Sequence, residues 1–275
     1  MDSPEELPTV LSLCTGYGGI ERGLELAGFE HRVVAHVEIE AFAIANLVAK
    51  MEAGQLDAAP IWSNLKTLPV DCFRDKVYLL TGGYPCQPFS AAGKRKGKDA
   101  PRPLWPYLND IIRAIRPVQC FFENVEGHIS LGLGEVIEDL EKLGYKTTWG
   151  IFSAEEVGAP HQRKRIFILA NPKGIGVQGL RTSGEQKPHA HGKEKLSVCE
   201  DERPRPTECD AFANLGRGFD GPPSWLDGSW ELGIPRVTSD QKNRVDRLRL
   251  LGNGVCPPTA ARAWTLLNEQ IKEEK

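Results

Sequence analysis

A chain of 275 residues with 40% hydrophobic and 26% charged residues has the composition of a globular protein with one large domain and room for a small second one. It contains no apolar run long enough to cross a membrane, residues 1–6 do not resemble a signal peptide, and seven cysteines without paired spacing favour a reducing compartment. The formal net charge of −3 argues against nonspecific, charge-driven nucleic-acid binding, but it allows a local basic groove.

The first third of the chain alternates between short apolar runs and amphipathic stretches, which is typical of an α/β fold. The first apolar run leads into a glycine-rich turn, which lets a cofactor approach the backbone, although an ordinary tight connection has the same composition. The second ends on Glu38, which could accept hydrogen bonds from ribose hydroxyls or be a solvated surface residue. We expect strands at 9–14, 32–37 and 61–62, and helices at 20–27 and 41–51.

A cysteine between two prolines follows the next expected strand, at 77–80. Proline fixes φ and cannot extend a central strand, so Cys86 should lie on a stiff turn at the carboxyl end of that strand. Ligands bind at this edge in open α/β sheets. The basic run that follows, within 91–103, reads either as a solvated loop or as a lid that closes on phosphates.

The second half continues the alternation, with expected helices at about 104–115, 133–143 and 259–274 and strands at 118–122, 145–153 and 166–169. The strand at 118–122 ends on Glu123, so this residue and Cys86 should face one crevice. Arg163 and Arg165 precede the strand at 166–169, and alternation would place both on one face of an extended segment, unless they are simply a charged strand edge.

The region at 171–239 is rich in Gly, Pro and charged residues and has no strong periodicity, which predicts a loop-rich insertion. We expect no metal site there, because the histidine and cysteine spacing fits no common zinc-finger pattern; the residues concerned are His189, His191, Cys199 and Cys209. An arginine-rich segment at 243–250 and a Gly-Asn-Gly-Val segment at 252–255 precede the last expected helix.

The hexapeptide Pro85-Cys86-Gln87-Pro88-Phe89-Ser90 resembles the nucleophile motif of the DNA (cytosine-5) methyltransferases. Six motifs of that family occur in family order over roughly 9–170 and 243–270. The chain departs from the usual pattern at several positions: Ser12 for aspartate, Cys14 for phenylalanine, Ile39 for an aromatic residue, Asn64 for aspartate, His161 for glutamine and Gly254 for serine or alanine.

This resemblance implies an α/β fold with a doubly wound, mostly parallel sheet of the S-adenosylmethionine-dependent methyltransferase type. Residues 1–170 and 243–275 would form the catalytic and cofactor-binding domain, and residues 171–242 a small variable target-recognition region.

The resemblance also assigns site residues. Cys86 would add to carbon-6 of cytosine, Glu123 would protonate or hydrogen-bond N3, Arg165 would contact O2, and Arg163 would support Arg165 or bind a phosphate. The residues implied for S-adenosylmethionine are Thr15, Gly16, Tyr17, Gly18, Gly19, Ile20, Glu38, Ile39, Asn64, Leu65, Gly83, Pro85, Leu104, Asn253, Gly254 and Val255. Those implied for DNA are Gln87, Ser90, Lys94, Arg95, Lys96 and Lys98.

The expected reaction is methyl transfer from S-adenosylmethionine to carbon-5 of a cytosine flipped out of double-stranded DNA. Methylation of RNA cytosine and a catalytically silent DNA-binding relative are the alternatives. We expect a monomer in the cytoplasm of a bacterial or phage-infected cell, and the resemblance allows a separately encoded restriction endonuclease as its partner.

Overall fold

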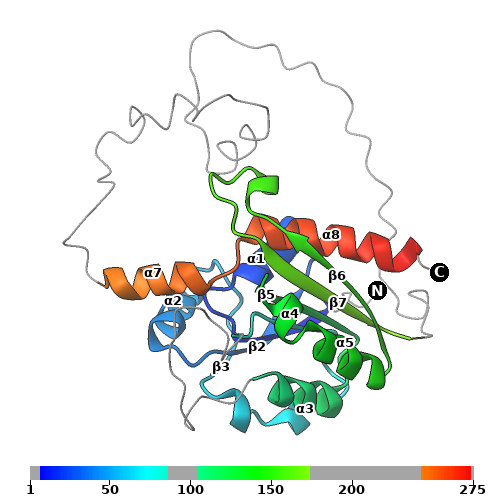
Figure 1. The fold of residues 1–275 in the computed structure, drawn as a ribbon. Coiled ribbons are helices and arrows are strands. Elements are labelled where there is room, and N and C mark those ends of the chain that lie inside the picture. Colours follow the sequence, from blue (N-terminus) through cyan, green and yellow to red (C-terminus); the bar gives the residue numbers. More distant parts are fainter. Residues whose placement is uncertain (1–6, 86–103, 174–242, 274–275) are drawn as a thin grey trace, which may run out of the picture.

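The computed structural model describes residues 7–85, 104–173 and 243–273. These residues form an α/β fold around a seven-stranded sheet with the order β3-β2-β1-β4-β5-β7-β6 (Figure 1). Its strands are β1 (Thr9–Leu13), β2 (Arg32–Val37), β3 (Ile61–Trp62), β4 (Leu79–Gly82), β5 (Gln119–Val125), β6 (Tyr145–Phe152) and β7 (Arg165–Pro172). The helices are α1 (Gly19–Leu26), α2 (Ala41–Glu52), α3 (Trp105–Ile115), α4 (His128–Leu131), α5 (Leu133–Lys142), α7 (Arg244–Asn253) and α8 (Pro257–Glu273), with short 3-10 turns at η1 (Leu65–Thr67), η2 (Val70–Phe73) and η3 (Glu155–Val157).

Within these residues the sheet is doubly wound and mostly parallel, as predicted. Strands β1 to β5 pair in parallel. From β1 the strands β2 and β3 are added on one side and β4 and β5 on the other, so the topological switch point lies between β1 and β4. β7 is antiparallel to both β5 and β6, and it pairs Val125 with Arg165. The carboxyl ends of β1, β2, β4 and β5 therefore meet the start of β7 at one edge, which is the usual ligand edge of such sheets.

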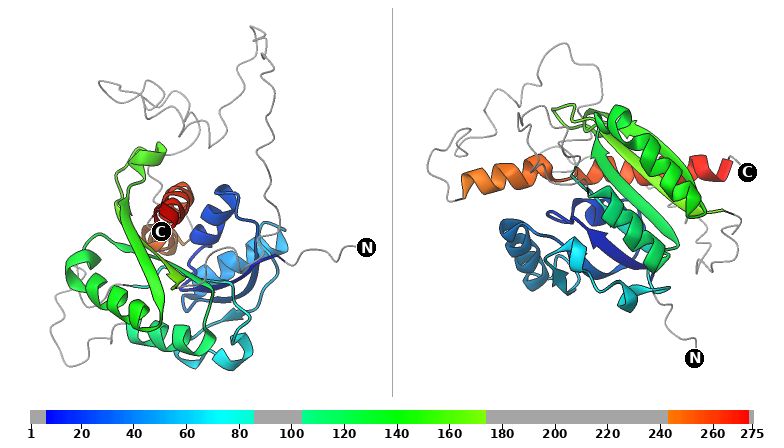
Figure 2. Two further views of the ribbon diagram at one scale, coloured as in Figure 1. Left: turned by 90° about the vertical axis from the view of Figure 1, so that its right-hand side faces the viewer. Right: turned by 60° about the horizontal axis from the view of Figure 1, so that its bottom comes forward.

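Helices cover both faces of the sheet, as the two turned views show (Figure 2). α3 and α5 pack on one face, over a core that includes Phe122 and Ile168. α1 and α8 cover the other face, where Phe121 and Phe167 lie beneath Trp264. α1 and α8 approach closely at Gly23, where a Cβ would lie only 2.6 Å from that of Ala260. This close approach holds the end of the chain against its beginning.

Several boundaries differ from the sequence-based expectation. β4 begins at Leu79 rather than at 77, and β5 continues through Glu123 to Val125 instead of ending at 122. The extension of β5 comes from its antiparallel pairing with β7, whose register joins Glu123 to Phe167. α4 and α7 were not expected as helices, and α7 includes Gly252 and Asn253 of the Gly-Asn-Gly-Val segment.

In the described ranges, no helix combines the length and apolar character needed to cross a membrane. The same ranges contain no group of three or more histidine, cysteine or acidic side chains that could hold a metal ion. Cys86, the basic run after it and the four histidine and cysteine residues of the insertion lie outside the described residues. The expected target-recognition region spans residues 171–242, and its residues 174–242 also lie outside the described ranges. The boundaries of this region stay a prediction.

Candidate active site

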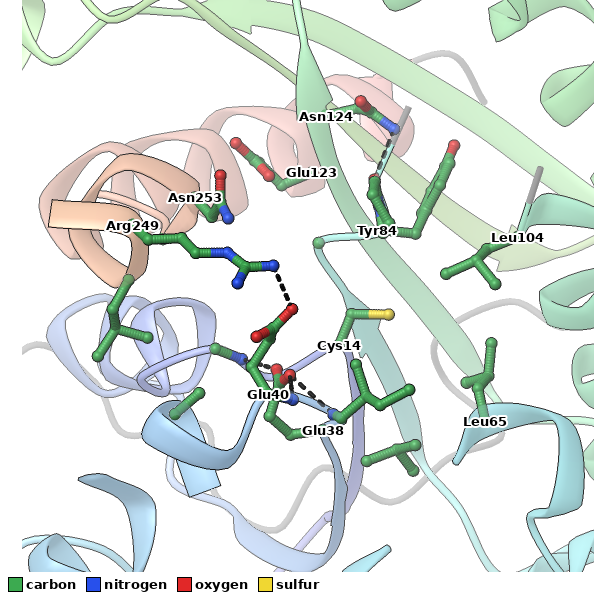
Figure 3. A pocket seen from close by; sticks show the side chains of 18 of the residues that line it. Cys14, Glu38, Glu40, Leu65, Tyr84, Leu104, Glu123, Asn124, Arg249 and Asn253 are labelled. Atoms are coloured by element: carbon green, nitrogen blue, oxygen red, sulfur yellow. Dashed lines mark hydrogen bonds and ion pairs between the residues drawn. The ribbon is translucent and has the colours of Figure 1, made fainter. Parts of the chain in front are cut away.

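A cavity of about 630 Å³ opens at the carboxyl edge of the sheet. Its walls come from the ends of β1, β2, β3, β4 and β5, from the start of β7, and from α7 (Figure 3). The view places Glu38 and Cys14 on one side of the cavity and Glu123 with Asn253 on another. The cavity therefore joins predicted cofactor residues, such as Glu38 and Asn253, with Glu123 and Arg165 of the predicted catalytic residues.

The glycine-rich turn after β1 packs against the Gly-Asn-Gly-Val segment near the end of the chain. The Tyr17 hydroxyl donates a hydrogen bond to the backbone carbonyl of Val255, and burial raises the pKa of Tyr17 to about 12, so it stays a donor. A Cβ on Gly19 would lie 2.4 Å from the same carbonyl oxygen, so only glycine fits there. The two segments, more than 230 residues apart, form one continuous wall.

Glu38 is fixed by backbone amides at the end of β2. Its Oε2 accepts a hydrogen bond from Gly16 N (2.7 Å), and its Oε1 accepts from Ile39 N (2.8 Å) and Glu40 N (2.9 Å). The side chain is buried, yet it lines the cavity, and a carboxylate has about four acceptor positions. Glu38 can therefore still accept a hydrogen bond from a ligand hydroxyl.

Ile39, Asn64, Leu65 and Leu104 line the same cavity beyond Glu38. Ile39 is 73% exposed, so it offers an open apolar surface at the rim. The Asn64 Oδ1 accepts a hydrogen bond from Lys66 N at 3.0 Å and thereby caps η1. One acceptor position of this amide oxygen is thus already used by the protein, and the other is available to a ligand.

The strand that leads to Cys86 is held from both sides at its end. Tyr84 Oη lies 3.0 Å from His128 Nε2 on α4, and Asn124 Nδ2 donates to the Tyr84 carbonyl oxygen at 3.1 Å. Burial lowers the pKa of His128, so its imidazole is neutral near pH 7. These contacts position Gly83 and Pro85 in the cavity wall, and the chain then enters the residues outside the described ranges.

Glu123 and Arg165 form a buried ion pair beside this strand end, on the neighbouring strands β5 and β7. Arg165 Nε lies 2.9 Å from Glu123 Oε1, and the two side chains are 19% and 7% exposed. Burial raises the pKa of Glu123 to about 7, even though Arg165 and Arg163 act in the opposite direction. Burial likewise lowers the pKa of Arg165. A glutamate that titrates near neutral pH can act as a proton donor, which is the chemistry expected of this residue.

Arg163 points to a different neighbour. It precedes β7 and has a φ of 37°, so the strand alternation that was expected to align it with Arg165 does not reach it. Its guanidinium donates hydrogen bonds to the backbone carbonyls of Gly252, at 2.9 Å, and Gly254. In this structure Arg163 therefore ties the start of β7 to the wall formed by the last glycine-rich segment, and its role toward base or phosphate stays a prediction.

An ion pair that the sequence did not predict closes one side of the cavity. Arg249 Nη2 on α7 lies 2.5 Å from Glu40 Oε1 at the start of α2 (Figure 3). Both residues line the cavity, as Asp246 does. The arginine-rich composition of 243–250 was the available signal, but the partner lies 209 positions away.

The structure thus gathers most of the predicted site residues. The large cavity is lined by Gly16, Glu38, Ile39, Asn64, Leu65, Gly83, Pro85, Leu104, Glu123, Arg165, Asn253 and Gly254. A second cavity of about 20 Å³ is lined by residues that include Thr15, Ile20 and Val255. Tyr17 and Gly18 lie in the turn between β1 and α1, and Gly19 is the first residue of α1; none of the three lines either cavity. Cys86 and the predicted DNA contacts at Gln87, Ser90, Lys94, Arg95, Lys96 and Lys98 lie outside the described residues.

Solved structures support the fold. A crystal structure of a DNMT2 mutant from Spodoptera frugiperda superposes with a TM-score of 0.51 at 23% sequence identity, covering 61% of this chain and 51% of that one. The Entamoeba histolytica methyltransferase EhMeth gives a TM-score of 0.50 at 20% identity, covering 61% and 53%. At these identities the likeness concerns the fold alone.

Sequence comparison supports the family. The Type II methyltransferase M.NgoMIV of Neisseria gonorrhoeae is 34% identical over 166 residues, which are 59% of this chain and 51% of the relative. The Type II methyltransferase M.NaeI of Lentzea aerocolonigenes is 30% identical over 168 residues, 58% of this chain and 39% of the relative. The chain therefore spans about half the length, or less, of these curated relatives. The family described as C-5 cytosine-specific DNA methylase matches residues 8–210, about three quarters of the chain, and the chain belongs to this family.

Proposed function

We propose that the chain transfers a methyl group from S-adenosylmethionine to carbon-5 of a cytosine in double-stranded DNA. The observation that carries this proposal is the Glu123–Arg165 pair, which shares one cavity with Glu38 and with the strand end that leads to Cys86. A proton donor, a cation and a ribose acceptor in one cavity are what cytosine and an adenosyl cofactor together require.

The cavity fits the cofactor by its volume and its donor set. It holds about 630 Å³, within the range of small-molecule sites, and its lining changes from Ile39 and Leu65 at one end to Glu123 at the other. When bound, S-adenosylmethionine supplies an electrophilic methyl group. In our proposal Glu38 accepts hydrogen bonds from the ribose hydroxyls, while Ile39, Asn64 and Leu65 surround the adenine.

The remaining steps belong to the side chains of the chain itself. The Cys86 thiolate adds to carbon-6 of the cytosine, which makes carbon-5 nucleophilic enough to take the methyl group. Glu123, with its pKa near 7, gives a proton or a hydrogen bond to N3 as negative charge develops there. Arg165, held by Glu123, donates to the cytosine O2. Loss of the carbon-5 proton to water then releases the cysteine.

A cytosine stacked in a duplex cannot reach a cavity at a sheet edge, so the base must be flipped out. We assign the choice of target sequence to residues 171–242, because this segment lies between two parts of the catalytic domain and carries none of the family motifs. The basic residues after Cys86 would contact phosphates, which hold the DNA without reading its sequence.

The test is covalent trapping on duplex DNA that carries 5-fluorocytosine, because fluorine cannot leave as the carbon-5 proton does. The wild-type protein should form a stable adduct that requires S-adenosylmethionine, and Cys86→Ser should form none. Cys72→Ser is the matched control, since Cys72 is exposed on η2 and should leave trapping unchanged. Adduct formation by Cys86→Ser would refute the mechanism. Methyl transfer to transfer RNA but not to duplex DNA would mean that the substrate is RNA and not DNA.

A further inference from the structure

The small cavity of about 20 Å³ is a side chamber of the large one. Both are lined by Cys14, Gly16, Gly83, Asn253 and Gly254. Its volume accommodates about one water molecule or one group of similar size. Glu21, on the first turn of α1, also lines it.

Glu21 is a buried carboxylate with only one of its oxygens satisfied. The residue is 1% exposed, and its Oε1 accepts a hydrogen bond from Thr81 Oγ1 at 2.7 Å. Its Oε2 has no hydrogen-bond partner among the residues that the structure describes. A buried polar atom left without a partner destabilises the fold, and more so when it is charged. Such an atom beside a small chamber therefore indicates a missing donor.

Two basic side chains that Glu21 influences do not supply that donor. His36 is fully buried; burial lowers the pKa of its imidazole more than Glu21 raises it, and both ring nitrogens lack partners in the described chain. The Lys50 Nζ donates to the Tyr17 carbonyl oxygen at 2.6 Å instead. Within the described ranges, no ion pair joins Glu21 to a cation, so the chamber is suited to a cationic group about the size of a water molecule.

The proposed function identifies which group this is. With the ribose at Glu38, the adenine toward Ile39 and Leu65, and the reacting methyl toward Glu123, the amino-acid end of the cofactor is the part that must lie near Gly16, Gly83 and Asn253. Those residues form the junction with the side chamber. The amino-acid end carries an α-ammonium group, which is small, cationic and a hydrogen-bond donor.

We propose that Glu21 is a positioning and specificity residue that binds the α-ammonium of the cofactor, directly through Oε2 or through one water in the chamber. This inference rests on the proposed function and deepens it. Glu21 distinguishes an adenosyl amino acid from an adenosyl compound without the amine, and it aligns the chain that carries the reacting sulfur.

The experiment measures binding rather than turnover. Calorimetry compares S-adenosylhomocysteine with its deaminated analogue, in which hydrogen replaces the α-ammonium, on wild type and on Glu21→Gln. Glutamine keeps an oxygen for Thr81 but loses the charge. Since charge-assisted hydrogen bonds contribute about 1.5–3 kcal/mol, the variant should bind S-adenosylhomocysteine about 10- to 100-fold more weakly. It should bind the deaminated analogue as wild type does.

Glu25→Gln is the matched control. Glu25 lies on the same helix but pairs with Arg22 at the surface, and this variant should bind both ligands normally. If Glu21→Gln weakens the binding of both ligands equally, Glu21 has a structural role alone. If the binding of both is unchanged, Glu21 Oε2 is satisfied by water without any contribution to ligand binding. Either result overturns the inference. If Glu21→Gln does not fold, the comparison on wild type still tests the proposal, because a deaminated analogue that binds wild type as tightly as S-adenosylhomocysteine does refutes recognition of the α-ammonium. Failure of wild type to bind S-adenosylhomocysteine would overturn the proposed function and this inference with it.

Discussion

The titration of Glu123 offers a test that does not require DNA. Burial raises the pKa of this carboxyl from an ordinary value of 4.5 to about 7. Between these values the native state holds the proton more tightly than the unfolded chain does, so the free energy of unfolding falls as pH rises from about 4.5 to about 7. Above that range the contribution is constant. Replacing Glu123 by glutamine removes this pH dependence.

The size of the effect follows from the pKa. A difference of about 2.5 between the native and unfolded pKa values, at about 1.4 kcal/mol for each, corresponds to about 3 kcal/mol. The stability of wild type relative to Glu123→Gln should therefore decrease by up to this amount between pH 4.5 and pH 7.5. The variant also leaves Arg165 without its carboxylate, but that penalty shifts the comparison equally at every pH in this range.

Urea denaturation at half-unit pH intervals provides the measurement, with Glu126→Gln as the control. Glu126 is exposed directly after β5, so its replacement should give a curve parallel to that of wild type. A constant difference between wild type and Glu123→Gln from pH 4.5 to 7.5 would show that Glu123 does not titrate near neutrality. The reasoning about its role as an acid would then fail. If that reasoning holds, Glu123→Gln should also slow methyl transfer by about 10²- to 10⁴-fold.

Three further predictions concern binding. Glu38→Ala should weaken S-adenosylhomocysteine binding by about 1–3 kcal/mol in calorimetry. It should also lower the Tm, because three backbone amides lose their acceptor. Normal affinity in the folded variant would remove Glu38 from the site. Arg163→Met should reduce cofactor affinity about tenfold by releasing the Gly252 and Gly254 carbonyls, whereas Lys164→Met, at an exposed position, should not; equal effects would contradict the contact. Replacing the four basic residues after Cys86 with glutamine should weaken DNA binding equally for all sequences and flatten its salt dependence; these residues are Lys94, Arg95, Lys96 and Lys98. A changed sequence preference at the same salt slope would argue against phosphate contacts.

Local patterns predicted the parts of the fold that depend on neighbouring residues. The apolar runs located the strands, and the glycine turn, Glu38 and Glu123 were expected at one edge because parallel strands end on the same side. The extension of β5 was not expected, because it depends on pairing with a strand about 40 residues later in the chain.

The parts of the site that were missed depend on contacts between distant segments. Arg249 reads as one of several surface arginines until α7 is placed over Glu40. Glu21 occupies a position that an amphipathic helix could leave in solvent, and only the packing of α1 on β4 buries it against Thr81. The hydrophobic periodicity and the spacing of motifs along the sequence do not predict these contacts, because the contacts arise from the tertiary arrangement of separate elements.

The contact between α8 and the sheet also sets an order of events during synthesis. The ribosome makes residues 174–242 after the strands of the sheet and before α7 and α8, and at about 5–20 residues per second this takes roughly 3–14 seconds. During that interval the face formed by Val10, Phe121 and Phe167 lacks Trp264 and Leu267, and the cofactor wall lacks Val255. The nascent chain thus presents an apolar sheet face that chaperones can bind. It cannot assemble the complete wall of the proposed cofactor pocket until residues 253–255 have been translated.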